Sequence, residues 1–273
     1  MPFLASASNR QAIVAGVQVG GLCALGYAAQ ALALGMGTSP GTAAFICSLQ
    51  SVVVALMAAR SSGVAVQTWL AVALSVAGVG CLELPSVLAA GDGGVTGPCI
   101  GDLIAFGQPL GFGLSYVVLE KGMKENPEDE LPLAALQCAV VALAAVAAAS
   151  AHGGVSPWQL DWGHLIPHAA IGEVLSFEQQ WGVPIAVLYT GVISTALTIW
   201  LCNSVFKRLP ATDASIILAS EPLWATGFAA LLLHAPLTAS TFAGGGLILF
   251  ALLSNEGLCD PLLPASMRGS KQE

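Results

Sequence analysis

Long runs of apolar residues, separated by short polar segments, limit the folds that are open to this chain. A helix that crosses the hydrocarbon core of a bilayer needs about 20 predominantly apolar residues. Hydrophobic residues make up 56% of the 273 residues, and only 9% are charged, whereas a soluble domain carries about 25% charged residues. So few charges cannot cover a surface that faces water, and we therefore expect the chain to lie in a lipid bilayer.

Eight of these runs are long enough to cross a bilayer as helices. We predict them at 12–35, 41–59, 66–82, 100–119, 131–151, 183–206, 211–233 and 237–253. Several connections between neighbours are only a few residues long, and such connections make the neighbouring helices antiparallel. The expected fold class is all-α, a polytopic membrane helix bundle with about eight transmembrane helices.

The positive charges agree with this number of helices. If the runs alternate in direction, the N-terminus, three loops and the C-terminus on one side hold every Lys and Arg: Arg10, Arg60, Lys121, Lys124, Lys207, Arg208, Arg268 and Lys271. Positive residues gather on the cytoplasmic side of a membrane protein. We therefore expect both termini in the cytoplasm, or in the stroma of a plastid. A long outer loop at 152–182 would lie on the opposite side.

An internal repeat relates the first part of the chain to its last part. Residues 21–59 align with residues 191–229 without a gap, at an offset of 170, and PGTAAFI from Pro40 then faces PATDASI from Pro210. The paired helices lie five helices apart, so they run in opposite directions through the membrane. Inverted repeats of this kind occur in secondary transporters, whose substrate site lies near the midplane at the repeat interface.

Polar residues deep inside the apolar runs are the candidates for such a site, because ionisable groups are costly in hydrocarbon. The substrate- or ion-binding candidates are Glu221, Pro222, Gln108, Pro109, Asn203, Gln50 and Ser51. A packing role is open for each. A protonated Glu221 could brace a kink at Pro222, and the other polar side chains could form hydrogen bonds between helices.

Residues from about 100 to 255 resemble a known transporter domain. The run LYTGVISTALTIWLCNSVFKRLPATDASIILASEPLWATGFAALLLHAPLTASTFAGGGLILFALL contains a Lys-Arg-Leu-Pro turn at 207–210, Glu221-Pro222 and a Pro-Leu-Thr restart at 236–238. It resembles the second EamA domain of the drug/metabolite transporter superfamily. GDLIAFGQPLGFGLSYVVLEKGM, from 101 to 123, is similar to the first helix of that domain.

The resemblance implies two repeats and a transport function. Residues 11–90 would be a partial first EamA repeat, 100–256 the second repeat, and 257–273 a polar tail. The family pattern has ten helices, so the resemblance implies that this chain lacks the first two. The expected function is secondary transport of a small metabolite by alternating access between the repeats. A truncated bundle without flux is the alternative.

Other classes of function find less support in the sequence. Eight Lys and Arg residues do not form a nucleic-acid-binding patch, and no phosphate-binding P-loop is present. An intramembrane enzyme is the weakest reading, because Asp102 lacks the Gly-x-Gly-Asp pattern. We expect no cofactor and no metal site; the expected partners are the lipid bilayer and a small-molecule substrate. Glycine-rich faces such as Gly16-x-x-x-Gly20 and Gly244–Gly246 could pack within the bundle or in a homodimer.

The charge distribution predicts that both termini lie on the same side of the membrane. A small epitope tag at each end, probed with antibody in sealed vesicles before and after permeabilisation, should show equal accessibility for the two tags. Opposite accessibility would contradict an even number of spans.

Overall fold

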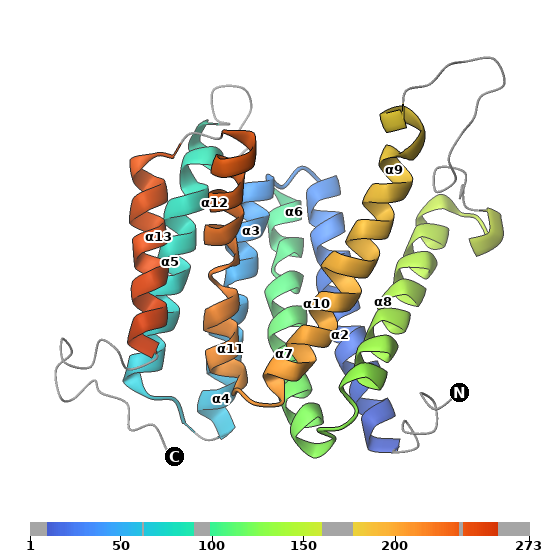
Figure 1. Ribbon diagram of the computed structural model, residues 1–273, viewed down its shortest axis with the longest axis horizontal. Coiled ribbons are helices and arrows are strands. Elements are labelled where there is room, and N and C mark those ends of the chain that lie inside the picture. The colour runs from blue at the N-terminus through green and yellow to red at the C-terminus, as the bar shows by residue number, and fades with distance from the viewer. Residues whose placement is uncertain (1–9, 62, 90–98, 160–176, 235–236, 256–273) are drawn as a thin grey trace. The chain divides into compact units, whose positions relative to one another are not determined.

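A computed structural model of the chain describes residues 10–61, 63–89, 99–159, 177–234 and 237–255 (Figure 1). Helices are the only regular elements in these ranges. The central part of the predicted outer loop, 160–176, and the predicted tail, 257–273, lie outside the described residues. So do residues 1–9, so the structure leaves the predicted side of the termini untested.

The elements follow one another along the chain with short connections. They are α2 (Arg10–Gly35), α3 (Pro40–Ser48), α4 (Gln50–Ser61), α5 (Val66–Ala89), α6 (Ile100–Ala105), α7 (Gly107–Glu125), α8 (Glu130–Gly153), the 3₁₀ turn η2 (Pro157–Gln159), α9 (Phe177–Tyr189), the π-helix η4 (Thr190–Leu197), α10 (Thr198–Phe206), α11 (Ala211–Leu218), α12 (Glu221–Leu233) and α13 (Ala239–Asn255).

Seven described helical segments are long and apolar enough to cross a membrane, and α13 is a shorter apolar helix of 17 residues. At 1.5 Å per residue, α13 is about 26 Å long, slightly shorter than the hydrocarbon core of about 30 Å. Large apolar side chains such as Leu231 and Leu232 are each 74% exposed, as expected for side chains that face lipid. The predicted all-α membrane bundle is confirmed.

The contacts divide the chain into two compact units. Unit 1 comprises Met1–Ala24 and Lys121–Arg208, and unit 2 comprises Leu25–Glu120 and Leu209–Glu273. In unit 1, α8 packs against α10 and against the N-terminal part of α2. Gly16 and Gly20 allow that close approach, because a Cβ atom at either position would lie 2.8 Å from Leu136 or Val140. These two glycines therefore pack within the chain itself.

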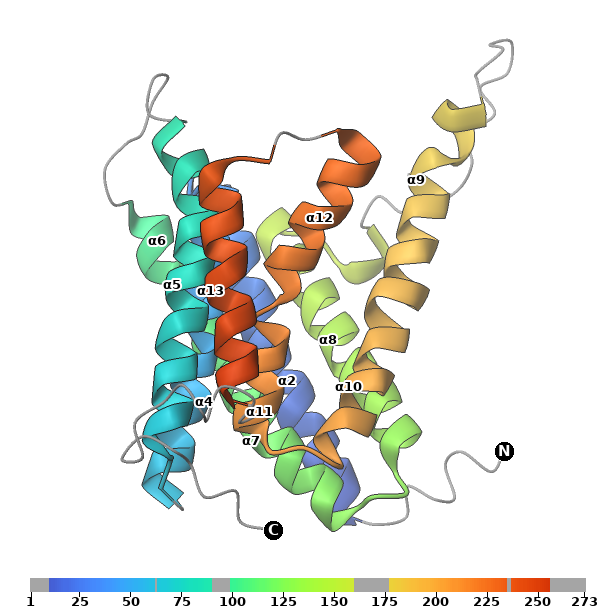
Figure 2. The same cartoon turned by 60° about the vertical axis from the view of Figure 1, so that its left-hand side comes forward.

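In unit 2, α5 packs along α13, and both views show the two helices side by side (Figures 1 and 2). Small residues bring the two backbones together. A Cβ atom at Gly244 would lie 2.6 Å from the carbonyl oxygen of Gly78, and one at Gly78 would lie 2.8 Å from that of Gly244. Helices without a hydrophobic driving force between them associate through such close packing.

Three of the spans that the sequence predicts as continuous helices are broken in the structure. The break between α3 and α4 is at Leu49, that between α6 and α7 is at Phe106, and that between α11 and α12 is at Ala219 and Ser220. Leu49 and Ala219 are 170 residues apart, which is the offset of the predicted repeat. All three breaks belong to unit 2.

Serine side chains and prolines explain how these breaks are tolerated in an apolar environment. Ser48 Oγ donates to the carbonyl of Phe45 at 2.7 Å, Ser51 Oγ donates to that of Ser48 at 3.0 Å, and Ser220 Oγ donates to that of Ile217 at 2.7 Å. These bonds satisfy carbonyl groups at or beside a break. Pro222 lies in the first turn of α12, where a missing N–H removes no helix hydrogen bond.

The packing of α13 predicts opposite effects for two neighbouring glycines. Gly244→Ala should lower stability by about 1–3 kcal/mol, because the new methyl group would meet backbone atoms of α5. Gly246→Ala should be neutral or stabilising by up to about 1 kcal/mol, because no atom lies within 4 Å of its Cβ position and alanine favours helix. Thermal unfolding in detergent micelles measures both, and equal losses would contradict this packing.

Candidate functional site

Two of the breaks lie halfway along their spans. Gln50 is central in the 22-residue span Pro40–Ser61, and Glu221 is central in the 22-residue span Ala211–Leu232. Each is the first residue of the helix that follows its break. The backbone therefore leaves regular helix geometry near the middle of the membrane at both places, and a polar side chain follows directly each time.

Two predicted site residues in unit 2, Gln50 and Gln108, interact with the thiol of Cys47 through their side chains. Cys47 Sγ lies 4.0 Å from Oε1 of Gln50 and points its weak donor at it. The side chain of Gln108 also hydrogen-bonds this thiol, and the carboxyl group of Glu221 lies within electrostatic reach of it. The structure thus places Gln50 and Gln108 at the Cys47 thiol and Glu221 within electrostatic range of it, which the sequence could not show.

These three side chains differ in burial. Gln50 is 7% exposed and Gln108 is 3% exposed, whereas Glu221 is exposed. The Glu221 side chain is therefore not enclosed by the described part of the chain, while the two amides are buried.

The other predicted residues of unit 2 support the backbone at the breaks. Ser51 is fully buried and its hydroxyl group is bonded to the carbonyl of Ser48. Pro109 is fully buried in the first turn of α7. Pro222 is the second residue of α12 and does not kink a continuous helix, so the predicted kink at this residue is instead a break before it. Pro222 has no N–H to donate to the carbonyl of Leu218. The backbone N–H and the hydroxyl group of Ser220 both donate to the carbonyl of Ile217.

Asn203 lies in unit 1, and its side-chain amide is hydrogen-bonded to two neighbouring residues. Its Oδ1 accepts from Nε2 of Gln137 at 3.3 Å, and its Nδ2 donates to the carbonyl oxygen of Glu130 at 3.1 Å. The carboxylate of Glu130 accepts from Lys207 at 2.8 Å and from Ser204 at 2.6 Å. These bonds join α8 to α10. Asn203 is 0% exposed, and the oxygen and the nitrogen of its amide group both take part in this contact between the two helices.

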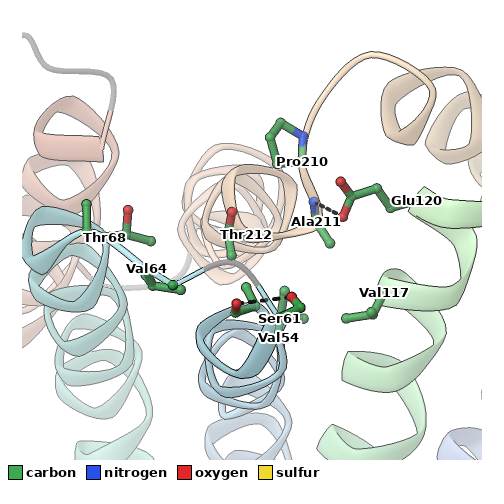
Figure 3. Close-up of a pocket in the computed structure, with 12 residues that line it drawn as sticks. Val54, Ser61, Val64, Thr68, Val117, Glu120, Pro210, Ala211 and Thr212 are labelled. Atoms are coloured by element: carbon green, nitrogen blue, oxygen red, sulfur yellow. Dashed lines mark hydrogen bonds between the residues drawn. The ribbon is translucent and has the colours of Figure 1, made fainter. Parts of the chain in front are cut away.

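A cavity of about 270 Å³ lies elsewhere in unit 2 (Figure 3). It is lined by Val54, Ala58, Ser61, Gly63, Val64, Ala65, Thr68, Val117, Glu120, Pro210, Ala211 and Thr212. These residues come from the end of α4, the start of α5, the end of α7 and the start of α11, so the cavity lies at the ends of the spans. None of the predicted site residues lines it.

Glu120 at this cavity is a residue that sequence reasoning missed. Its Oε2 accepts a hydrogen bond from the backbone N–H of Ala211 at 2.9 Å, and Figure 3 shows the carboxylate turned toward the first turn of α11. The N-cap of α11 is Pro210, which has no polar side chain to cap the helix. The missing side-chain cap was the signal in the sequence for such an acceptor, because the first N–H groups of a helix need acceptors from elsewhere.

The described residues contain no group of three or more His, Cys, Asp and Glu side chains that could hold a metal ion.

Comparison with known proteins gives a family and a fold. A model of the EamA-like transporter family matches residues 99–255, which is more than half of the chain. No match was found among curated proteins. Eleven chains of solved structures match. One of them, described only as the crystal structure of a protein, has a TM-score of 0.66 and 16% identity, over 92% of this chain and 77% of its own length. At that identity the likeness shows the fold alone.

The hydrogen bonds of Asn203 between α8 and α10 predict that substitution of this residue lowers the stability of the protein. Asn203→Leu should destabilise the protein by about 1–3 kcal/mol, because the amide of Gln137 and the carbonyl of Glu130 lose a buried partner. The thermal midpoint of the purified protein measures this. An unchanged midpoint, together with altered solute binding, would move Asn203 back into the site.

Proposed function

The chain belongs to the EamA-like transporter family, and from this premise we propose that it is a secondary transporter of a small metabolite. It is an integral, multi-pass membrane protein of the drug/metabolite transporter superfamily. The substrate and the transport cycle are our proposals. They are supported by the group of polar side chains at the breaks in unit 2, above all by Glu221 at the restart of α12.

Broken helices suit a site that changes shape. Irregular backbone is tolerated at membrane depth only where protein or a cavity satisfies its polar groups, and transporters place such segments at their substrate sites. Here α3–α4 and α11–α12 break at Leu49 and Ala219. These positions correspond under the predicted inverted repeat. We propose that alternating access moves one repeat against the other around these two breaks.

Glu221 is the proposed coupling residue. The central parts of the described spans hold no Lys or Arg, and the spans have their basic residues in the end turns. A carboxyl group at mid-span can bind and release a proton or a cation during the cycle, which a Gln or Ser side chain cannot do. The arrangement disfavours multiply charged anions as substrates, because these need Arg or Lys partners.

The test is uptake by the purified protein in liposomes, with and without an imposed pH gradient, across a panel of labelled amines, amino acids and neutral metabolites. Wild-type protein should accumulate at least one solute in a manner that depends on the gradient. Glu221→Gln should keep the fold and lose this dependence, because Gln has a similar shape but cannot ionise.

Asp213 provides the matched control. It lies on the same span, in the first turn of α11, and its Oδ1 accepts from Asn255 Nδ2 at 2.9 Å. Asp213→Asn retains an acceptor for that bond, so gradient-dependent uptake should persist. Gradient-dependent uptake that survives in Glu221→Gln would show that this carboxyl group only supports the helix restart.

A further inference from the structure

The side-chain oxygen of Gln108 is an unpartnered acceptor in the interior of unit 2. Gln108 is 3% exposed, and its Oε1 has no hydrogen-bond partner in the described part of the chain. Two serine hydroxyl groups share this condition, but a hydroxyl group can rotate toward a new partner, whereas the carbonyl oxygen of Gln108 can only accept. A buried carbonyl without a donor costs stability, so its presence needs a reason.

A second buried glutamine has a hydrogen bond from its amide nitrogen to another side chain. Gln137 is also 3% exposed, and its amide donates to Asn203 in the contact between α8 and α10. The two residues have the same type and burial but differ in their partners. Gln137 therefore contributes to packing through its amide nitrogen, whereas the oxygen of Gln108 has no donor in the described part of the chain.

The surroundings of Gln108 place this oxygen at the proposed site. It is the second residue of α7, directly after the break at Phe106. Helix α7 lies close against α4, because a Cβ atom at Gly113 would be 2.8 Å from Val53 Cβ and 3.0 Å from the carbonyl oxygen of Gln50. The Gln108 side chain also hydrogen-bonds the thiol of Cys47, and the charge of Glu221 acts on that thiol electrostatically.

The chemistry of this group points to a donor with positive charge. Glu221 offers a carboxylate, and Gln108 offers an unused carbonyl oxygen. No Lys or Arg lies in the central part of any described span. A protonated amine has three N–H donors and one positive charge, so a single group could satisfy both acceptors.

We propose that Gln108 Oε1 accepts a hydrogen bond from the ammonium group of the transported solute while Glu221 balances its charge, so that the protein selects protonated amines over quaternary ammonium ions. A quaternary ion carries the charge but has no N–H for Gln108. This inference rests on the proposed transport function, and it names the solute class and the residue that recognises it.

The experiment measures binding, so that its outcome is separate from flux. Propylammonium and tetramethylammonium are cations of similar size at pH 7, and only the first has N–H donors. Each is titrated against the purified full chain, and the rise in thermal midpoint gives an apparent Kd. Wild-type protein should bind propylammonium about tenfold more tightly, which corresponds to one hydrogen bond to a charged donor.

Gln108→Met separates recognition from packing. Met has a similar length and no acceptor of comparable strength, so the variant should lose most of the preference for propylammonium and keep only the part that comes from the Glu221 carboxylate. Without ligand its thermal midpoint should be unchanged or higher, because an unpaired buried oxygen has been removed. Gln137→Met should lower the midpoint, since Asn203 loses its donor, and should keep the preference for propylammonium.

Three results would overturn the proposal. Equal binding of the two ions by wild-type protein would mean that water supplies the donor to Gln108. An undiminished preference in Gln108→Met would assign recognition to another residue, and failure of both ions to bind would exclude this solute class. Binding with the expected preference but without uptake in liposomes would instead contradict the proposed transport function and leave the assignment of Gln108 standing.

Discussion

The backbone hydrogen bond inside a medium without water is the constraint on which the structure depends. Each N–H and C=O group in the hydrocarbon core must find a partner within the protein, which is why every described span is helical. A break in such a helix is stable only if other groups take up the released carbonyls. Ser48, Ser51 and Ser220 do this locally at two of the three breaks, and Pro222 lies in the first turn of a new helix, where its missing N–H costs nothing.

The same breaks make unit 2 suitable for function. They place Gln50 and Gln108 at the Cys47 thiol and Glu221 within electrostatic range of it, each beside backbone that can change its geometry without losing a long run of helix hydrogen bonds. The rigid part of unit 2 is different in character, because α5 and α13 meet through Gly78 and Gly244 at a distance that leaves no room for side chains. A closely packed helix pair next to broken helices is an arrangement in which one part can move while the other stays fixed.

Hydropathy predicted the spans well because bilayer thickness sets their length. The predicted run at 211–233 has the same ends as α11 and α12 together, and the predicted run at 183–206 shares its last residue with α10. The breaks could not be read from hydropathy, since they depend on which hydroxyl group competes for which carbonyl. Asn203 and Gln108 looked alike in the sequence as polar residues in apolar runs. Only the fold shows that Asn203 is paired across α8 and α10 and that the oxygen of Gln108 is not. The role of Glu120 was missed because its partner, Ala211, is 91 residues away in the chain.

Cys47 allows the central claim, a solute site at the breaks that opens to each side of the membrane in turn, to be tested directly. Its thiol is half-buried, interacts with Gln50 and Gln108, and lies within electrostatic range of Glu221. With the other cysteines replaced by alanine, a membrane-impermeant methanethiosulfonate reagent can be applied to either face of oriented, sealed proteoliposomes. The account predicts that Cys47 reacts from both faces, and that propylammonium slows both reactions. Reaction from one face only, or from neither, would contradict alternating access at this site.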